Sequence, residues 1–298
     1  MTFPSANVLV QVVIVGLLTG GVYALMAGGL SLIFGVMRVI NIAHGAFLVL
    51  SGYIAYWLFT RYGLDPLLSV LITIPLFFLI GIVFQRYMLS RVRGEPGLFV
   101  LVTFALAITL EGIMGALWQS TGRSVRTEYT GEVIRLAVLN LNLRLPIVRV
   151  IGFAAAVGVM TFFHILILRS NLGRAIRATI QNSTAAQLVG VNVARVQAVA
   201  FGFGLAAVAA GGAIFSLIWT FNASNHEEWI AKMLSIIVLG GMGSLPGAFI
   251  AALIMGVVES VAAVTLTTYL SPIVFYLILF LVLIFRPQGL LGARLREG

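Results

Sequence analysis

The long apolar blocks of this sequence carry few ionisable side chains, and four of them stand out: His44, Glu111, His164 and Glu259. If such blocks lie in lipid, a charged side chain costs at least about 2.5–3.5 kcal/mol, so these residues usually face a protein interior or a cavity. His44 either lines a pathway or bonds a backbone carbonyl that is freed where a helix breaks. Glu259 either faces a translocation path or pairs with a polar neighbour. We expect Glu111 to bond a neighbouring helix and His164 to lie near the membrane surface.

The residues that could act in catalysis do not form a recognisable catalytic set. There is no cysteine, so thiol chemistry, disulfides and cysteine metal sites are impossible. The sequence has no HExxH motif, no GxxxxGK[ST] phosphate loop and no series of acidic residues that would relay protons or bind sodium. A membrane-embedded enzyme would have to use His44 with Glu259, a pair that no spacing supports. We expect no catalytic residue, metal or cofactor in this chain, so any uphill transport must draw its energy from elsewhere.

The composition is that of an integral membrane protein. Of the 298 residues, 61% are hydrophobic and only 9% are charged, whereas soluble domains have about 25% charged residues. A spanning helix needs about 20 apolar residues. Blocks of roughly this kind occur at 8–35, 43–60, 66–85, 97–118, 150–168, 196–221, 230–266 and 271–285. The sequence therefore predicts a single all-α membrane domain, residues 1–298, with seven or nine crossings according to whether 230–266 is a re-entrant hairpin or crosses twice.

Basic residues predict the orientation of the domain. Eleven basic residues and two acids lie in Arg38, 85–96, 169–195 and the tail from Arg286, and an excess of arginine marks cytoplasmic loops. The C-terminus is then cytoplasmic and the N-terminus external. Residues 119–149 become an external loop, whose alternating run VIRLAVLNLNLRL predicts a strand or hairpin. This loop either contacts an external partner or forms a cap over the helices.

The cytoplasmic loop 169–195 is polar, basic and free of acids. Asn171 can cap a short helix that begins near Leu172, and Asn182 or Ser183 can cap a second one. Gly190 stands where a helix would end in the left-handed conformation. The sequence therefore predicts that this loop forms two short helices outside the membrane.

Two irregular stretches break the apolar pattern and form a short internal repeat. Residues 41–47 read NIAHGAF and residues 243–249 read GSLPGAF, the second within the glycine-rich break 240–247. Broken backbone at membrane depth is tolerated inside protein or beside a cavity, and transporters often consist of two such repeats around a midplane site. The helices that start near Gly45 and Gly247 would aim N–H groups at that cavity, where a carboxylate could bind.

The sequence resembles the H-type permease subunits of branched-chain amino-acid ABC importers. The resemblance is carried by GLLTGGVYALMAGGLSLIFGVMRVINIAHGAF (16–47), NLGRAIRATIQNSTAAQLVGVNV (171–193), LGGMGSLPGAFIAALI (239–254) and LIFRPQGLLG (283–292). It implies a fold similar to type II importers, with broken helices and related halves. It also implies a second, related permease subunit, two cytoplasmic ATPase subunits that bind ATP and Mg²⁺, and a periplasmic solute-binding protein in a bacterial inner membrane.

The resemblance assigns an ATPase-coupling role to one group of residues, which would comprise Gly173, Arg174, Arg177, Ala178, Ala186 and Gly190. Independently of the resemblance, the helix breaks and the polar residues of the membrane blocks suggest a translocation path at Asn41, His44, Gly45, Gly241, Gly243, Ser244 and Glu259. The solute would be a branched-chain or hydrophobic amino acid. Alternative solutes, for permeases of the same family, are urea, short amides or aromatic and carboxylic acids. An alternative function is that of a stand-alone secondary transporter or channel.

Overall fold

A computed structural model of the protein describes residues 6–92, 95–138, 141–266, 270–286 and 288–291. Arg93, Arg294 and Arg296, which contribute to the charge count, lie outside these residues. The α-helices are α1 (Ala6–Met37), α2 (His44–Tyr62), α3 (Pro66–Tyr87), α4 (Pro96–Trp118), α5 (Ile147–Arg169), α6 (Asn171–Gln181), α7 (Ser183–Leu188), α8 (Val193–Ile218), α9 (His226–Gly240), α10 (Leu245–Thr265) and α11 (Ser271–Phe285). Short 3₁₀ turns lie at η1 (Leu89–Val92), η2 (Glu128–Gly131) and η3 (Ala223–Asn225). The prediction of an all-α membrane protein is confirmed.

Six helices of the described chain are long and apolar enough to cross a membrane: α1, α3, α4, α5, α8 and α10. Helix α11 is apolar but shorter, with 15 residues. The predicted block 43–60 corresponds to α2, and the predicted block 230–266 covers most of α9 together with α10. Helix α2 begins at the first break, and α9 ends at the second. The number of full crossings stays a prediction.

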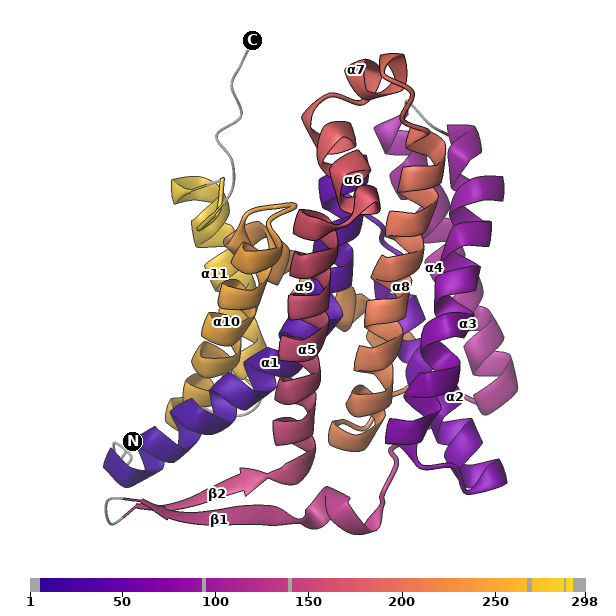
Figure 1. The fold of residues 1–298 in the computed structure, drawn as a ribbon. Coiled ribbons are helices and arrows are strands. Elements are labelled where there is room, and N and C mark those ends of the chain that lie inside the picture. The colour runs from indigo at the N-terminus through magenta and orange to yellow at the C-terminus, as the bar shows by residue number, and fades with distance from the viewer. Residues whose placement is uncertain (1–5, 93–94, 139–140, 267–269, 287, 292–298) are drawn as a thin grey trace.

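Helix α8 lies at the centre of the bundle, and most of its length is buried. It packs against α1, α2 and α3 (Figure 1). Its contact with α3 depends on two glycines, because a Cβ built on Gly81 would lie 2.7 Å from the Cα of Gly202. In lipid, such small residues let helix backbones approach closely.

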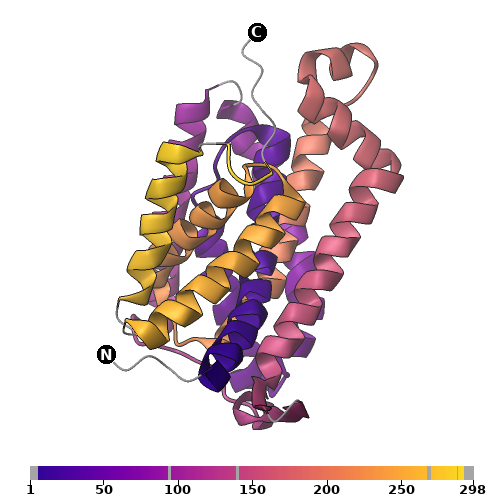
Figure 2. The same ribbon diagram turned by 90° about the vertical axis from the view of Figure 1, so that its left-hand side faces the viewer.

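Helix α1 makes its longest contact with α10. A Cβ on Gly20 would lie 2.6 Å from the carbonyl oxygen of Ala252, and one on Gly256 would lie 2.4 Å from the carbonyl oxygen of Gly16. The glycine clusters of the sequence are therefore mainly packing residues. In Figure 2, α5 and α11 lie at opposite edges of the bundle.

Both predicted breaks are present. Residues 38–43 separate α1 from α2, and residues 241–244 join α9 to α10 in a tight hairpin. Gly241 and Gly243 have φ of +95° and +86° in this turn, a region that glycine adopts without steric cost. Residues 230–266 thus form two helices joined by a turn, and the relation between the two breaks as an internal repeat stays a prediction.

The alternating run in the loop 119–149 forms the predicted hairpin. Strands β1 (Val133–Val138) and β2 (Leu141–Pro146) pair antiparallel, with Arg135 opposite Arg144. The hairpin lies at one end of the bundle, and α6 and α7 project from the other end (Figure 1). The two loops that interrupt the membrane helices are therefore on opposite sides.

Candidate functional site

Helix α6 packs on the end of α5 through a narrow buried face. Gly173, Ile176 and Thr179 are buried at intervals of three residues. A Cβ on Gly173 would lie 2.2 Å from the carbonyl oxygen of Leu166, so this glycine permits the contact between the two helices. The cap is Ser170, whose Oγ accepts from the N–H of Gly173 at 2.8 Å. The prediction of Asn171 as the cap was wrong by one residue.

The opposite face of α6 carries exposed arginines. Arg174 donates to Oδ1 of Asn171, and Arg177 donates to the carbonyl oxygen of Ile167. Arg177 therefore links α6 to the last turn of α5, while Arg174 bonds only within its own helix. Both side chains remain exposed, and Ala178 beside them is half-buried.

Helix α7 is the outermost element at this end of the protein. Asn182 caps it, accepting from the N–H of Ala185 at 2.9 Å, which confirms one of the two predicted caps. Ala186 is buried, and its carbonyl accepts from Val191 at 2.9 Å. Gly190 has φ +86°, as expected for a residue that ends a helix. Asn192 then caps α8, accepting from the N–H of Arg195.

Two large apolar side chains at the C-terminal end of α7, which we call its tip, are exposed. Leu188 is 85% exposed and Val189 is 80% exposed. Figure 2 shows α6 and α7 projecting beyond the helical bundle. Exposed apolar side chains that lie next to each other on a projecting turn are one mark of a protein-interaction site.

A basic groove of about 650 Å³ lies beside this tip, between the end of α3 and the start of α8. Arg86, Ser90, Asn192 and Arg195 line it, and no acid does. Both arginines are exposed, and among the described residues neither forms an ion pair. The groove and the tip of α7 together form a basic, partly apolar surface, which we call the α7 surface.

The polar centre of the bundle is an ion pair between Lys232 of α9 and Glu259 of α10, with Nζ 3.1 Å from a carboxylate oxygen. Lys232 is only 5% exposed. Its Nζ also lies 3.0 Å from Glu228, one turn earlier on α9. Tyr23 of α1 donates its hydroxyl to the other oxygen of Glu259. Three helices are thus joined by charge-assisted bonds in an otherwise apolar core.

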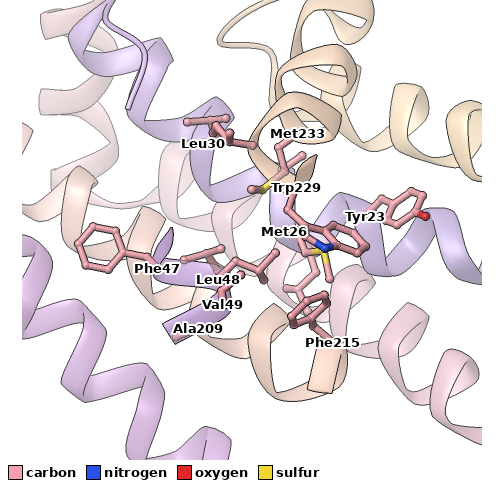
Figure 3. Packing of buried hydrophobic residues seen from close by; sticks show 14 of the residues in the cluster. Tyr23, Met26, Leu30, Phe47, Leu48, Val49, Ala209, Phe215, Trp229 and Met233 are labelled. Atoms are coloured by element: carbon pink, nitrogen blue, oxygen red, sulfur yellow. The ribbon is translucent and has the colours of Figure 1, made fainter. Parts of the chain in front are cut away.

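Aromatic rings surround this cluster. Nζ of Lys232 lies 4.8 Å from the ring centroid of Trp229 and 5.6 Å from that of Phe275, distances suited to cation–π attraction. The ring of Tyr23 stacks on Trp219 at 5.9 Å. Figure 3 shows Trp229 together with Met26 and Phe215 where α1, α8 and α9 meet. Apolar surroundings of this kind lower the local dielectric constant and so strengthen an ion pair.

The residues predicted around the first break are deeply buried. Asn41 and His44 have no exposed surface, and Nε2 of His44 lies 3.3 Å from the carbonyl oxygen of Met26. Met26 lies in the middle of α1, so this contact links α2 to α1 and is not the predicted bond to a carbonyl freed at the helix break. Gly45 allows α2 to approach α9, because a Cβ there would lie 2.4 Å from the carbonyl oxygen of His226.

The residues predicted around the second break form the turn itself. Ser244 caps α10 by accepting from Gly247 at 3.1 Å, and Gly243 packs against Gly35 of α1. Glu259 lies 15 residues further along α10, a rise of roughly 22 Å. The structure therefore does not bring Glu259 to this turn, and Glu259 pairs with Lys232 instead of approaching His44.

The two remaining polar residues of the membrane blocks have clear surroundings. Glu111 of α4 lies 3.0 Å from Nε2 of His226, so the expected bond to a neighbouring helix is present. His164 lines a pocket of about 460 Å³ between α5 and α10, together with Thr161, Pro246 and Phe249.

Sequence reasoning overlooked Lys232, although a signal was available. Lys232 is the only lysine of the chain and falls inside the apolar block 230–266. A lysine and a glutamate in membrane helices usually pair with one another. Tyr23 and Trp229 carried no comparable signal, because aromatic residues are common in such helices.

Comparisons with known proteins agree with the resemblance noted from the sequence. The family model described as "Branched-chain amino acid transport system / permease component" matches residues 12–285. The high-affinity branched-chain amino acid transport system permease protein BraD of Pseudomonas aeruginosa is 28% identical, with 95% of each chain covered. LivH of Escherichia coli, with the same description, is 26% identical over 93% of each chain. A probable LivH of Methanocaldococcus jannaschii is 22% identical over 90% of this chain and 88% of the relative.

Proposed function

Because the chain belongs to the family of permease components of branched-chain amino acid transport systems, we propose that it is the translocation subunit of an ATP-driven importer. Members of this family are multi-pass membrane permeases, not enzymes, and a component works within a transporter complex. In the proposal, separate ATPase subunits bind ATP and Mg²⁺ and hydrolyse the nucleotide. This chain converts their closure into opening and closing of a path.

The observation that carries the proposal is the exposure of Leu188 and Val189 on a projecting helix. The helix is held by a cap at Asn182, by the buried Ala186 and by the turn at Gly190. A rigid apolar knob suits insertion into a groove of a partner protein. We propose that an ATPase subunit supplies that groove and that Gly173, Arg174, Arg177 and Ala178 support the knob.

The basic groove of the α7 surface supports the same partner. Arg86 and Arg195 carry uncompensated positive charge beside the knob. A partner with carboxylates around an apolar groove would match this arrangement, and complementary charge mainly fixes orientation and association rate. Motion of the docked ATPase would reach the bundle directly, since α6 packs on α5 and Asn192 caps α8.

The other partners in the proposal are a related permease subunit and a periplasmic solute-binding protein. The pocket between α5 and α10 lies on a lightly buried part of the bundle, where a second permease would complete the path. The β1–β2 hairpin lies at the end opposite α6 and α7, as a binding protein would require. In the proposal, the N-terminus is periplasmic and the C-terminus cytoplasmic, within a bacterial inner membrane.

We assign the predicted path residues two roles. Glu259 belongs to the polar cluster that joins α1, α9 and α10, and this cluster would hold the helices in one arrangement until the ATPases move them. Asn41, His44, Gly45, Gly241, Gly243 and Ser244 shape the two breaks, at which the helices can bend. The burial of Asn41, His44, Gly45 and Gly241 supports positioning of the path walls over direct contact with solute, whereas Gly243 and Ser244 are half-buried.

The substrate follows from the relatives, whose names specify branched-chain amino acids. We therefore propose leucine, isoleucine and valine as solutes. Urea, short amides and aromatic or carboxylic acids are the alternatives. The test is affinity purification of the chain from its native membrane, followed by ATPase assays with each solute and the binding protein. Two ATPase chains should co-purify, and branched-chain amino acids should stimulate hydrolysis more than the other solutes do.

A further inference from the structure

A pocket of about 170 Å³ lies between the end of α1, the end of α3, the start of α4 and the start of α8. It is at the same end of the bundle as α6 and α7, because α8 follows α7 directly. The pocket is far larger than the roughly 10–15 Å³ that one water requires. Its polar lining comes from Arg38, Gln85, Glu95 and Gln197, and its apolar wall includes Leu89 and Phe99.

Two buried acceptors in this lining have no partner. The Oε1 atoms of Gln85 and Gln197 are buried without a hydrogen bond within the described chain, and Gln85 is only 2% exposed. An unsatisfied buried polar atom destabilises the folded state, because it has lost its hydrogen bonds to water. Amide oxygens only accept hydrogen bonds, so the missing partner is a donor such as an ammonium group or water.

The lining also contains one positive and one negative side chain that do not pair. Arg38 and Glu95 form no ion pair with each other or with another described residue. Both are exposed at the pocket. The backbone of Arg38 has φ +58°, which is unusual for a residue with a side chain and persists only where the surroundings hold it. The two charges thus remain available on one small pocket.

We propose that this pocket binds a zwitterionic amino acid with a short aliphatic side chain. Arg38 receives the carboxylate, and Glu95 with the amide oxygens of Gln85 and Gln197 receives the ammonium group. The aliphatic part lies against Leu89 and Phe99. This inference rests on the proposed function, since the ligand is the transported class of solute, and it adds a site on the side where the product is released.

The site is tested by equilibrium binding of radiolabelled leucine to the whole complex in lipid nanodiscs, with the periplasmic binding protein left out. We expect saturable binding to the wild type, weakened about tenfold or more by Glu95→Gln and by Gln85→Leu. Glu95→Gln changes a single exposed group, so this variant should fold even if Gln85→Leu does not. Arg61→Gln, an exposed change at the far end of α2, is the control and should bind like the wild type.

Analogues distinguish a zwitterion site from a simple cation or anion site. Isoamylamine lacks the carboxylate and isovalerate lacks the ammonium group, so each should compete at least about tenfold more weakly than leucine. Absence of saturable leucine binding, equal binding by wild type and Glu95→Gln, or competition by one analogue as strong as that of leucine would overturn the inference. If the complex still performs ATP-driven uptake in that case, the proposed function stands. If the chain does not assemble with ATPases at all, the proposed function itself fails.

Discussion

Lys232 and Glu259 form an ion pair, with 3.1 Å between Nζ and a carboxylate oxygen, and Lys232 is the only lysine or arginine among the described buried residues. The pair joins α9 to α10, the two helices that the turn Gly241–Ser244 connects. Tyr23 joins α1 to the same carboxylate. The α9–α10 hairpin, which contains the second break, is therefore stabilised both at its turn and away from it. Gly243 in the turn packs against Gly35 of α1. Further from the turn, the Lys232–Glu259 ion pair holds α9 to α10.

Removal of one partner of this pair should destabilise the protein strongly. Lys232→Met and Glu259→Gln each leave a buried group without its counterpart, and breaking a buried pair costs about 3–5 kcal/mol. Thermal unfolding of the purified chain in detergent measures the effect, and the double variant should lose less than the sum of the two. Glu228→Gln, which removes a more exposed partner, is the control. Single variants no less stable than this control would contradict a structural role for the pair.

The exposed tip of α7 should be needed for assembly and not for folding. Replacing Leu188 and Val189 together by serine should reduce co-purification of ATPase subunits about tenfold or more, as expected for central apolar contacts. The unfolding temperature should not change, because both side chains are already exposed. Tyr62→Ser alters a side chain that is 68% exposed at the other end of the bundle and should leave assembly intact. Equal recovery of ATPases with both variants would argue against docking at α7.

Gly173 and Arg174 are adjacent in sequence but should give different defects. Gly173→Ala would place a Cβ 2.2 Å from the carbonyl oxygen of Leu166, so α6 should detach from α5 and become accessible to limited proteolysis. Arg174→Gln changes an exposed side chain and should leave the proteolysis pattern unaltered while lowering the uptake achieved per ATP hydrolysed. If the two variants gave the same phenotype, Gly173 would not act through packing and Arg174 through docking.

The contact between Tyr129 and Asp65 should make the hairpin end sensitive to alkaline pH. Burial, and then the bond that Tyr129 donates to Asp65 at 2.8–2.9 Å, raise the pKa of Tyr129 from 10.0 to about 12. Its contribution to stability is therefore complete below pH 10 and is lost as the pH rises through about 12. The thermal unfolding temperature of the wild type should therefore fall in a step over this range. Tyr129→Phe should show no such step, and a step retained in that variant would assign it to another group.

Local features of the functional site could be predicted from the sequence because they depend on neighbouring residues. Asn182 caps α7 and Gly190 ends it through interactions that span only a few positions. The β1–β2 hairpin follows from simple alternation. Even here the cap of α6 is Ser170, since the end of α5 decides where the next helix begins.

Features that depend on distant contacts could not be predicted. Glu259 was recognised as unusual, but its partner Tyr23 comes from α1, and no pattern in the sequence indicates this contact. Gly173 was expected to dock a partner, whereas its place against Leu166 makes it a packing residue. The pocket at Arg38 and Glu95 combines four helix ends, and no periodicity in the sequence indicates that they meet.

The most direct test of the account is reconstitution of uptake in proteoliposomes. The chain is combined with its ATPase subunits, its second permease and its binding protein, and uptake of radiolabelled leucine is followed with and without ATP. Accumulation should require ATP and every component, and it should be lost in the variant with Leu188 and Val189 replaced by serine. Accumulation by this chain alone, driven by an ion gradient without ATPase subunits, would contradict the proposed function.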